Sequence, residues 1–551
     1  MEKHTKNGIK CWNLGFFQQR FLYLCLVFLL VSMTSVWAGN TIETTFANVK
    51  TLKGTVVDSK GEPLIGATVL VQGTTLGTIT DVEGKFSVQA SVGATLEFSY
   101  LGYSTVIYKV KTLGDIFITM TEDVHMVEEV VVVGYGVQKK ETVTGAISSV
   151  NTKALVQSSQ ANISNALVGR LPGLTAVQKS GEPGNDQSII RIRGIGSFAG
   201  SYDSDLQNPL VMVDGIEVAN YNNIDPNEIE NVAILKDASA TAVYGVRGAN
   251  GVILITTKRG MVEKPKLSVS TSYAINSFTN LREPMDAYNW AVQLNETRKY
   301  DGYLTGNYDP VFTDEEIRKF KDNSDPVFYP NTNWVDMLFK ETSLQTQHNI
   351  NLRGGTERVK YFASLGVFTQ GGMYNNTDLV PDYDAQVRYK RYNFRTNFDF
   401  KVTKRLDVTL NVSDQLEFVN RPNEDTGVVL SYAFAHPPTS GPGVVDGKVI
   451  ENLDGRYNYS RNPVTRIMIN SGALKNYSNQ LNVSVKPTYD LGFLLKGLSV
   501  HAMISYQQWN WHSTRYYKEV QTYKAVKKPD GSPSFLPQGT PSPYGLTESL
   551  S

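Results

Sequence analysis

The residue types that carry catalysis or bind metals are sparse in this chain and stand in no familiar arrangement. Its two cysteines, Cys11 and Cys25, lie near the N-terminus. None of the six histidines belongs to the H-E-x-x-H pattern of zinc hydrolases. The stretch Gly196-Ser197-Phe-Ala-Gly200 has the wrong spacing for the G-x-S-x-G turn that presents a nucleophilic serine. We therefore expect no enzyme, no cofactor and no metal site.

One segment could act through its backbone, by hydrogen bonding along the edge of a strand. It comprises Glu129, Val130, Val131, Val132 and Val133. Consecutive β-branched residues favour an extended chain, and the glycines that follow end it. Such a strand is either buried in the core of a neighbouring domain or adds its edge to a partner's sheet as a docking strand. The spacing alone favours neither alternative.

Length and composition limit the classes of protein to which the chain can belong. It has 551 residues, 53 Lys+Arg against 53 Asp+Glu, and a mean hydropathy of −0.24. At about 150 residues per domain, this length holds three or four domains. Zero net charge argues against a nucleic-acid partner, because such binders carry a basic excess. The mean hydropathy excludes a polytopic helical membrane protein but not a membrane β-barrel, whose strands are apolar on one face only.

Residues 1–38 have the pattern of a secretory signal peptide. A basic start is followed by an apolar run over 21–31, and Val36 and Ala38 suit a cleavage site. A retained membrane anchor is the alternative, but polar residues within 32–35 interrupt the apolar run. We predict an exported protein that loses both cysteines with its signal peptide and forms no disulfide.

Beyond the signal, the pattern of apolar residues changes along the chain. Short apolar runs separated by turn signals predict a small β-sandwich over 51–121. We interpret residues 122–140 as a linker. Residues 141–260 mix short strands that end in Gly turns with short helical stretches, which is typical of an α/β unit.

The last part of the chain alternates apolar and polar residues over ten or more positions at a time. In 406–413 apolar residues hold the even positions and polar residues the odd ones, and 392–401 shows a similar alternation. Strands of soluble sandwiches are usually only about 5–6 residues long. The pattern is typical of a transmembrane β-barrel, apolar toward lipid and polar toward a wet interior. We interpret Trp509 and Trp511 as aromatic residues of the membrane interface.

Three motifs in the α/β unit resemble those of one family. They are Arg191-Ile-Arg193-Gly-Ile-Gly196, Val213-Asp214-Gly215 and the ungapped block from Leu235 to Gly260. On these motifs the chain is similar to the SusC/RagA family of TonB-dependent outer-membrane transporters. The stretch 51–121 resembles the carboxypeptidase-regulatory-like domain that is often fused to such transporters.

The resemblance implies a mostly β fold: a small β-sandwich, an α/β plug domain and an incomplete antiparallel transmembrane β-barrel. The implied divisions are 1–38 signal peptide, 51–121 sandwich, 122–140 linker, 141–260 plug and 261–551 part of the barrel. Residues 129–133 lie where the family has its TonB box, which favours the docking strand. The plug residues that match the family's motifs, with structural or gating roles, are Arg191, Arg193, Gly194, Asp214, Gly215, Lys236, Asp237, Tyr244, Gly245, Arg247, Gly248 and Gly251.

The family resemblance also implies a function, namely import of oligosaccharides or peptides across a bacterial outer membrane. Force would come from TonB with its ExbB–ExbD energy-coupling complex, and a SusD-like lipoprotein would close over the barrel. The plug charges could bond to polar residues of the barrel wall, in a structural role. Alternatives are a non-transporting surface receptor or adhesin, and a non-functional fragment of the transporter. Barrels of this family have about twenty-two strands, and 261–551 has room for about ten, so we expect the N-terminal portion of a longer chain.

Overall fold

The computed structural model describes most of the chain from residue 50 to residue 550. The positions not described are 1–49, 73, 75, 101–102, 104, 113, 122–129, 134–135, 140–146, 159, 195–206, 219, 376, 378, 380–382, 452–462, 465–471, 518–520, 540–544 and 551. The predicted signal peptide, Ser197 and Glu129 therefore lie outside the described residues. The chain divides into two compact units, Met1–Glu128 and Glu129–Ser551, and each is described by itself.

The first unit contains a β-sandwich, as the sequence predicted. One sheet has the order β4–β1–β7, formed by Lys85–Ala90, Lys50–Val57 and Ile116–Thr119. The other has the order β3–β2–β5–β6, formed by Gly77–Ile79, Thr68–Val71, Thr95–Ser99 and Val106–Lys109. Alternate residues of β2 and β4 are buried, so each sheet turns one face to a shared core. There Phe86 of β4 meets Phe98 of β5 edge to face, with ring centroids 5.3 Å apart.

The α/β part of the second unit, called the plug below, is built on one mixed sheet. Its strand order is β10–β15–β16–β13–β14, with bounds Ile147–Asn151, Ile229–Leu235, Val252–Thr257, Leu210–Val213 and Ile216–Glu217. A separate hairpin pairs β11 (Leu174–Gln178) with β12 (Ser188–Ile192). The central strands β15 and β16 are apolar runs that are almost wholly buried, because the plug covers both of their faces.

Short helices complete the plug. They are α2 (Thr152–Leu155), α3 (Ile163–Ala166), η3 (Pro226–Glu228), α4 (Ala238–Thr241) and η4 (Ala242–Gly248). The η3 turn begins with the Asp225 side chain accepting the N–H of Asn227 at the cap.

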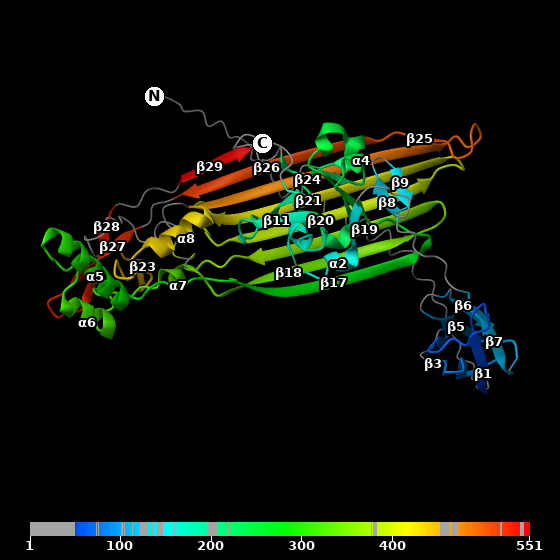
Figure 1. Ribbon diagram of the computed structural model, residues 1–551, viewed down its shortest axis with the longest axis horizontal. Helices are drawn as coiled ribbons and strands as arrows, with labels where there is room; N and C mark the ends of the chain where they lie inside the picture. Colours follow the sequence, from blue (N-terminus) through cyan, green and yellow to red (C-terminus); the bar gives the residue numbers. More distant parts are fainter. Residues whose placement is uncertain are drawn as a thin grey trace, which may run out of the picture. The chain divides into compact units, whose positions relative to one another are not determined.

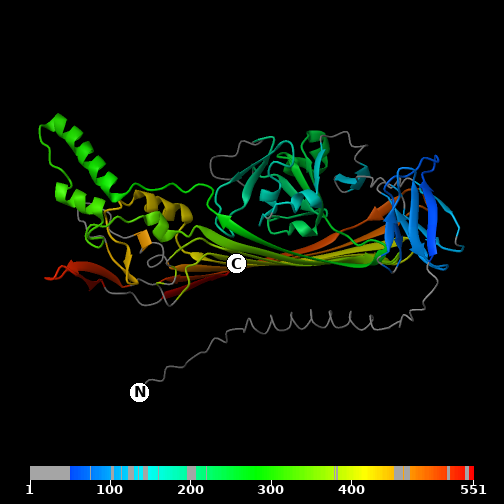
Figure 2. The ribbon, with the colours of Figure 1, turned by 90° about the horizontal axis from the view of Figure 1, so that it is seen from below.

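A large antiparallel sheet, called the wall below, forms the rest of the second unit. Its order is β17–β18–β19–β20–β21–β24–β26–β29, with β25 (Ser499–His501) paired beside β24. The strand bounds are Glu263–Ser277, Thr342–Gly355, Val359–Gly371, Arg388–Lys401, Leu406–Pro422, Ala473–Asp490, Ile504–Tyr517 and Gly545–Leu550. The wall is curved, and the plug lies against one of its faces, called the inner face below (Figure 2).

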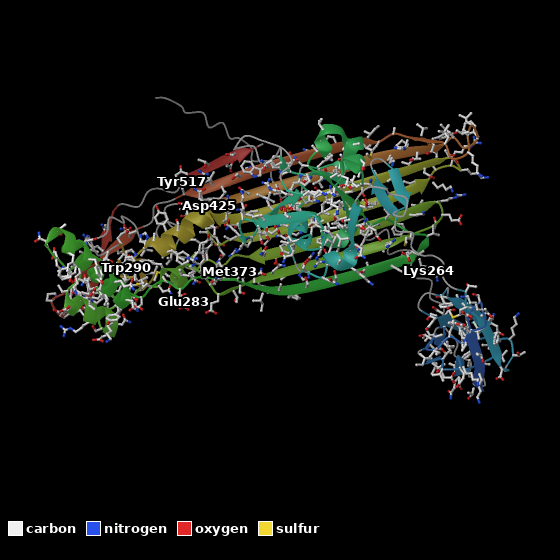
Figure 3. The ribbon with its side chains drawn as sticks, in the orientation of Figure 1. Lys264, Glu283, Trp290, Met373, Asp425 and Tyr517 are labelled. Atoms are coloured by element: carbon white, nitrogen blue, oxygen red, sulfur yellow. The ribbon has the colours of Figure 1, made fainter. Side chains whose placement is uncertain are left out.

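Short and long connections alternate along the wall, so that the long ones gather at one end. The short turns are 356–358 and 402–405, with 491–498 between β24 and β25. The long connections are 278–341, 372–387, 423–472 and 518–544, and together they are called the loop cap. Figure 3 places Lys264 at the short-turn end of the wall and Met373 and Asp425 toward the loop cap.

The loop cap contains helices and two small hairpins (Figure 1). These are α5 (Ala287–Thr305), α6 (Asp314–Asp322), α7 (Trp334–Leu338), α8 (Thr426–Ala435), β22 (Val444–Val445), β23 (Lys448–Val449), β27 (Thr522–Lys527) and β28 (Pro533–Gln538). No helix of the described residues is long and apolar enough to cross a membrane.

Three connections of the loop cap share one hydrophobic core. Trp334 and Leu338 of α7 pack with Val387 of the 372–387 connection and with Val429 of α8, and all four are buried. The indole N–H of Trp334 donates to the carbonyl of Pro437, 3.0 Å away. The described loop cap is therefore a folded structure with its own core, in contrast to independent loops.

The variant Trp334→Ala is expected to unfold the loop cap locally. Truncating a fully buried aromatic side chain costs about 3–5 kcal/mol, and Trp334 is 1% exposed. Limited proteolysis of the purified protein, read by mass spectrometry, should show new cleavage within the cap. Tyr303→Ala is the control, because Tyr303 on α5 is 78% exposed. Equal cleavage of the two variants would contradict the shared core.

Candidate functional site

The valine run predicted to dock a partner forms a strand of its own. Val130–Val133 is β8, which pairs antiparallel with β9 (Gly136–Lys139). Within the described residues, this two-stranded sheet shares no strand with the sandwich or with the plug sheet. One edge of β8 is thus paired to β9, and no described strand pairs with the other edge. An unpaired edge is what strand addition requires.

The charged residues of the plug motifs pair with other groups of the plug. Arg193 forms an ion pair with Asp237 at 2.5 Å, and Arg247 pairs with Glu217. Both pairs are partly exposed, so each contributes at most about 1 kcal/mol. Their arrangement supports a structural role within the plug.

Two further motif residues act through hydrogen bonds inside the plug. Arg191 on β12 donates to the side-chain oxygen of Gln207 at 2.6 Å. The ammonium of Lys236 donates to the hydroxyl of Ser148 at 2.7 Å and to the carbonyl of Pro172 at 3.0 Å. Lys236 therefore links β10 to the start of the β11–β12 hairpin.

A tight turn joins β13 to β14 at Asp214 and Gly215. Both residues have positive φ, 50° and 87°, as in the two-residue turns that match the twist of a hairpin. The Asp214 carboxylate accepts the backbone N–H of Thr257 at 3.0 Å and its hydroxyl at 2.6 Å. The turn is thereby tied to the end of β16.

The remaining motif residues are required by backbone conformation or packing. Gly194, Gly245 and Gly251 have positive φ. A Cβ on Gly248 would lie 3.0 Å from the carbonyl oxygen of Thr241. The side chain of Tyr244 is buried in a small hydrophobic cluster of the plug.

The variant Gly251→Ala is expected to destabilise the plug by about 1–3 kcal/mol. Its φ of +87° disfavours an L side chain, and an added Cβ would lie 2.8 Å from the Ile192 side chain. Protease resistance of the plug at increasing temperature measures the effect. Gly181→Ala is the matched control, because nothing lies within 4 Å of its Cβ and its φ is not positive. If both variants kept wild-type resistance, the packing role of Gly251 would be wrong.

The plug is held to the wall mainly by strand β20. From Arg391 to Asp399, every second residue faces the plug and bonds to it, which is the predicted alternation. Arg391 donates to the carbonyl of Ala161 at 2.8 Å, and Asn393 donates to that of Asn223 at 2.6 Å. Asn397 donates to the carbonyl of Lys258 at 2.7 Å, and Asp399 pairs with Arg259 at 2.9 Å. Arg395, in the middle of this row, forms an ion pair with Glu228 at 2.8 Å.

The Arg395–Glu228 pair is almost completely removed from solvent, with side-chain exposures of 4% and 1%. Burial raises the pKa of Glu228, and the positive charge of Arg395 opposes that rise. The second carboxylate oxygen of Glu228 has no hydrogen-bond partner among the described residues. Nearby, the Asp225 carboxylate accepts the amide of Gln347 on β18 at 3.1 Å. Asp225 caps the start of η3 and Glu228 ends it, so the two buried acids that flank this turn both bond to the wall.

On the other side, toward β24 and β26, the plug is held more loosely. Gln507 of β26 donates to the backbone carbonyl of Glu217 at 2.8 Å. A cavity of about 30 Å³ lies beside this contact, between the β13–β14 turn and the wall. Its lining mixes polar residues, such as Asp214 and Gln415, with apolar ones, such as Ile216, Val218 and Val483.

The orientation of β26 corrects the interpretation of its two tryptophans. Gln507 contacts the plug, so Trp509 and Trp511, two and four residues further on, also lie on the inner face. Their predicted role as interface aromatics on the outer face is wrong. The alternating pattern in β26 is weak, because the outer positions Gln508 and Asn510 are polar too.

The residues that fasten the plug to the wall are not those of the sequence motifs. Arg391, Arg395, Asp225 and Glu228 have no mutual spacing that marks them, since the acids and the arginines are more than 160 residues apart. The one signal in the sequence for these contacts was that the two arginines stand at the polar positions of an alternating strand. Groups of three or more metal-ligating side chains are absent from the described residues.

Comparisons with known proteins match both parts of the chain. The model of the TonB-dependent Receptor Plug Domain matches residues 139–252, and that of the CarboxypepD_reg-like domain matches residues 52–132. TonB-dependent receptor P26 of Formosa agariphila is 32% identical over 413 residues, which are 74% of this chain and 37% of the relative. TonB-dependent receptor SusC of Bacteroides thetaiotaomicron is 31% identical over 405 residues, 72% of this chain and 36% of the relative.

The fold agrees with these relatives. The solved structure of the RagAB peptide importer in the 'open-open' state superposes with a TM-score of 0.56 at 27% identity, covering 71% of this chain and 43% of that chain. The matched region spans little more than a third of the length of the curated relatives.

Proposed function

This chain belongs to the SusC/RagA family of TonB-dependent receptors, and from that premise we propose that it imports oligosaccharides or peptides across a bacterial outer membrane. The observation that carries the proposal is the row of β20 side chains that bond to the plug. A folded domain held by polar bonds against a curved sheet has the arrangement of a gate that can be released and reseated. The named relatives are receptors and an importer, and none is named as an enzyme.

The wall has the features expected of strands that cross a membrane. On β20 the positions that alternate with the plug-bonding row carry Thr396 and four aromatic residues, Tyr392, Phe394, Phe398 and Phe400. The aromatic residues would face lipid. Barrels of outer membranes have short periplasmic turns and long extracellular loops. We therefore assign the short-turn end to the periplasm and the loop cap to the cell surface, with residues 1–38 as the export signal.

Energy for opening would reach the plug through the docking strand. The outer membrane has no ATP, so work must arrive by mechanical pull. Residues 129–133 would add to a sheet of TonB, itself driven by ExbB–ExbD, and resist pulling through several backbone hydrogen bonds of about 1 kcal/mol net each. The extended backbone of β8 supports this role. A SusD-like lipoprotein would cover the loop cap, and the linker, plug and barrel boundaries drawn from the sequence belong to the same proposal.

Growth of a gene-deletion strain tests the proposal. Cells that lack the gene should fail to grow on the cargo as sole nutrient when the cargo is too large for porins, and should still grow on its monomers. Restoring the gene should restore growth. Surface binding of the cargo without any uptake by wild-type cells would instead identify a receptor or adhesin.

A further inference from the structure

The loop that joins β11 to β12, residues 179–187, touches both the wall and the loop cap, and it is called the hairpin tip below. A Cβ on Gly184 would lie 3.0 Å from the Tyr389 ring and 3.1 Å from the Val419 side chain, both on the inner face of the wall. In the same loop, the side chain of Glu182 lies beside Thr426, the first residue of α8. The plug therefore meets a helix of the cap through this loop.

The start of α8 is held in place by the rest of the loop cap. The hydroxyl of Tyr374, in the 372–387 connection, donates to the hydroxyl of Thr426 at 3.1 Å. One turn further along α8, Val429 is completely buried in the core that this helix shares with α7 and with 372–387. A shift of the cap core would therefore move Thr426 with it.

The hairpin tip is also bonded to the part of the plug that β20 holds. The carboxylate of Asp186 accepts the side-chain amide of Asn162 at 2.6 Å, and the backbone carbonyl of Asp186 accepts that of Asn165 at 2.8 Å. Asn162 directly follows Ala161, whose carbonyl is the acceptor for Arg391. Movement of the tip would therefore disturb the first bond of the β20 row.

The carboxylate of Glu182 makes the contact between tip and cap a costly one. Glu182 is 7% exposed, and neither of its carboxylate oxygens makes a well-formed hydrogen bond to a described residue. Burial raises the pKa of Glu182, and Thr426 and Arg421 only partly oppose that rise. The ionised carboxylate thus loses free energy while the tip rests against α8, and it regains its hydration when the tip moves away.

We propose that the hairpin tip is a latch through which the loop cap keeps the plug in place. While α8 keeps its position in the cap core, the tip stays beside Thr426 and supports the bond between Ala161 and Arg391. When cargo bound at the loop cap displaces α8, Glu182 moves into water and the tip separates from the cap. The inference rests on the proposed import function and assigns its regulation: cargo at the cell surface loosens the plug before any pull begins.

A contact that served only for packing would be built differently. An apolar side chain of similar size would fill the position of Glu182 without losing hydration and would hold the cap more firmly. In a latch, the tip and α8 stabilise each other through one contact, so a change that loosens α8 must also loosen the tip. This coupling can be measured without cargo and without TonB.

Hydrogen exchange of the detergent-purified protein, read by mass spectrometry, tests the coupling. Val429→Ala loosens α8 by truncating a fully buried side chain. We expect the backbone amides of 179–187 to exchange roughly tenfold faster, which equals about 1.4 kcal/mol. Phe312→Ala is the matched control, because Phe312 is also buried but belongs to the separate core of α5 and α6. Unchanged exchange at 179–187 in Val429→Ala, or an equal increase in both variants, would overturn the latch.

Glu182→Gln tests the charge. The variant keeps the shape of the side chain and removes the cost of burying a carboxylate, so exchange at 179–187 should become about tenfold slower. Uptake of the cargo should slow as well, with surface binding unchanged. Glu230→Gln is the matched control, because Glu230 is an exposed glutamate of the same plug. A carboxylate that only stabilises the fold predicts the opposite result, and exchange in Glu182→Gln as fast as in the wild type or faster would refute the proposal.

The latch and the import function fail in different ways. If exchange at 179–187 ignores both α8 and the charge of Glu182, but uptake needs residues 129–133, the importer stands without the latch. If exchange responds as expected but uptake continues without residues 129–133, the latch stands and TonB-driven import is wrong.

Discussion

Deleting residues 129–133 is expected to reduce uptake of the cargo by roughly 100-fold or more and to leave surface binding unchanged. A four-residue strand such as β8 offers about four backbone hydrogen bonds of about 1 kcal/mol each. Because every 1.4 kcal/mol is tenfold in an equilibrium constant, losing them removes almost all coupling to a pulling partner. Accumulation of labelled cargo in energised cells measures uptake, and binding at 4 °C measures recognition.

Point variants separate the backbone from the side chains of this segment. Val131→Pro removes one N–H and should behave like the deletion, because strand addition depends on backbone bonds. Val131→Ile keeps the strand and should transport normally. Deleting five residues at 122–126 controls for the shorter linker. Normal uptake by the deletion or by Val131→Pro would show that the segment does not transmit force.

Glu228→Ala is expected to loosen the plug by about 3–5 kcal/mol, since it leaves the Arg395 guanidinium buried without its partner. Weaker attachment should let large solutes leak past the plug. Cells that express the variant should become sensitive to vancomycin, an antibiotic too large for porins. The plug should also become cleavable by protease at lower temperature.

Two further variants distinguish the ion pair from general damage. Replacing both partners, as Glu228→Leu with Arg395→Met, should recover much of the stability, because apolar pairs of similar size often match buried ion pairs. Glu217→Ala breaks a partly exposed pair with Arg247 and should cost at most about 1 kcal/mol. If Glu228→Ala leaked no more than Glu217→Ala, the fastening role of the buried pair would be wrong.

The fold could be predicted from local patterns where each pattern had one physical cause. The alternation in 392–401 marked a strand with two different faces, and β20 has them. The mixture of short strands and short helical stretches predicted an α/β unit, and the plug, with its mixed sheet and short helices, is one. In β26 the alternation was ambiguous, because both faces carry polar residues, and the face that meets the plug was assigned wrongly.

The fastening of the plug could not be predicted, because it depends on contacts between distant parts of the chain. Nothing in the sequence around Asp225 and Glu228 marks them as partners of the wall. Only the folded wall brings Gln347 and Arg395 to them. The motif residues, in contrast, could be recognised because their turns and glycines leave a local pattern, although their partners, such as Ser148 for Lys236, are also distant in the sequence.

The unequal attachment of the plug has a mechanical consequence. Five side chains of β20 grip one flank, whereas Gln507 holds the flank at β26. Bonds loaded one after another yield at far smaller force than bonds loaded together. A pulling force on the plug should therefore separate it from β26 first and rotate it about its contacts with β20. Passage of the cargo would then begin beside Trp509 and Trp511.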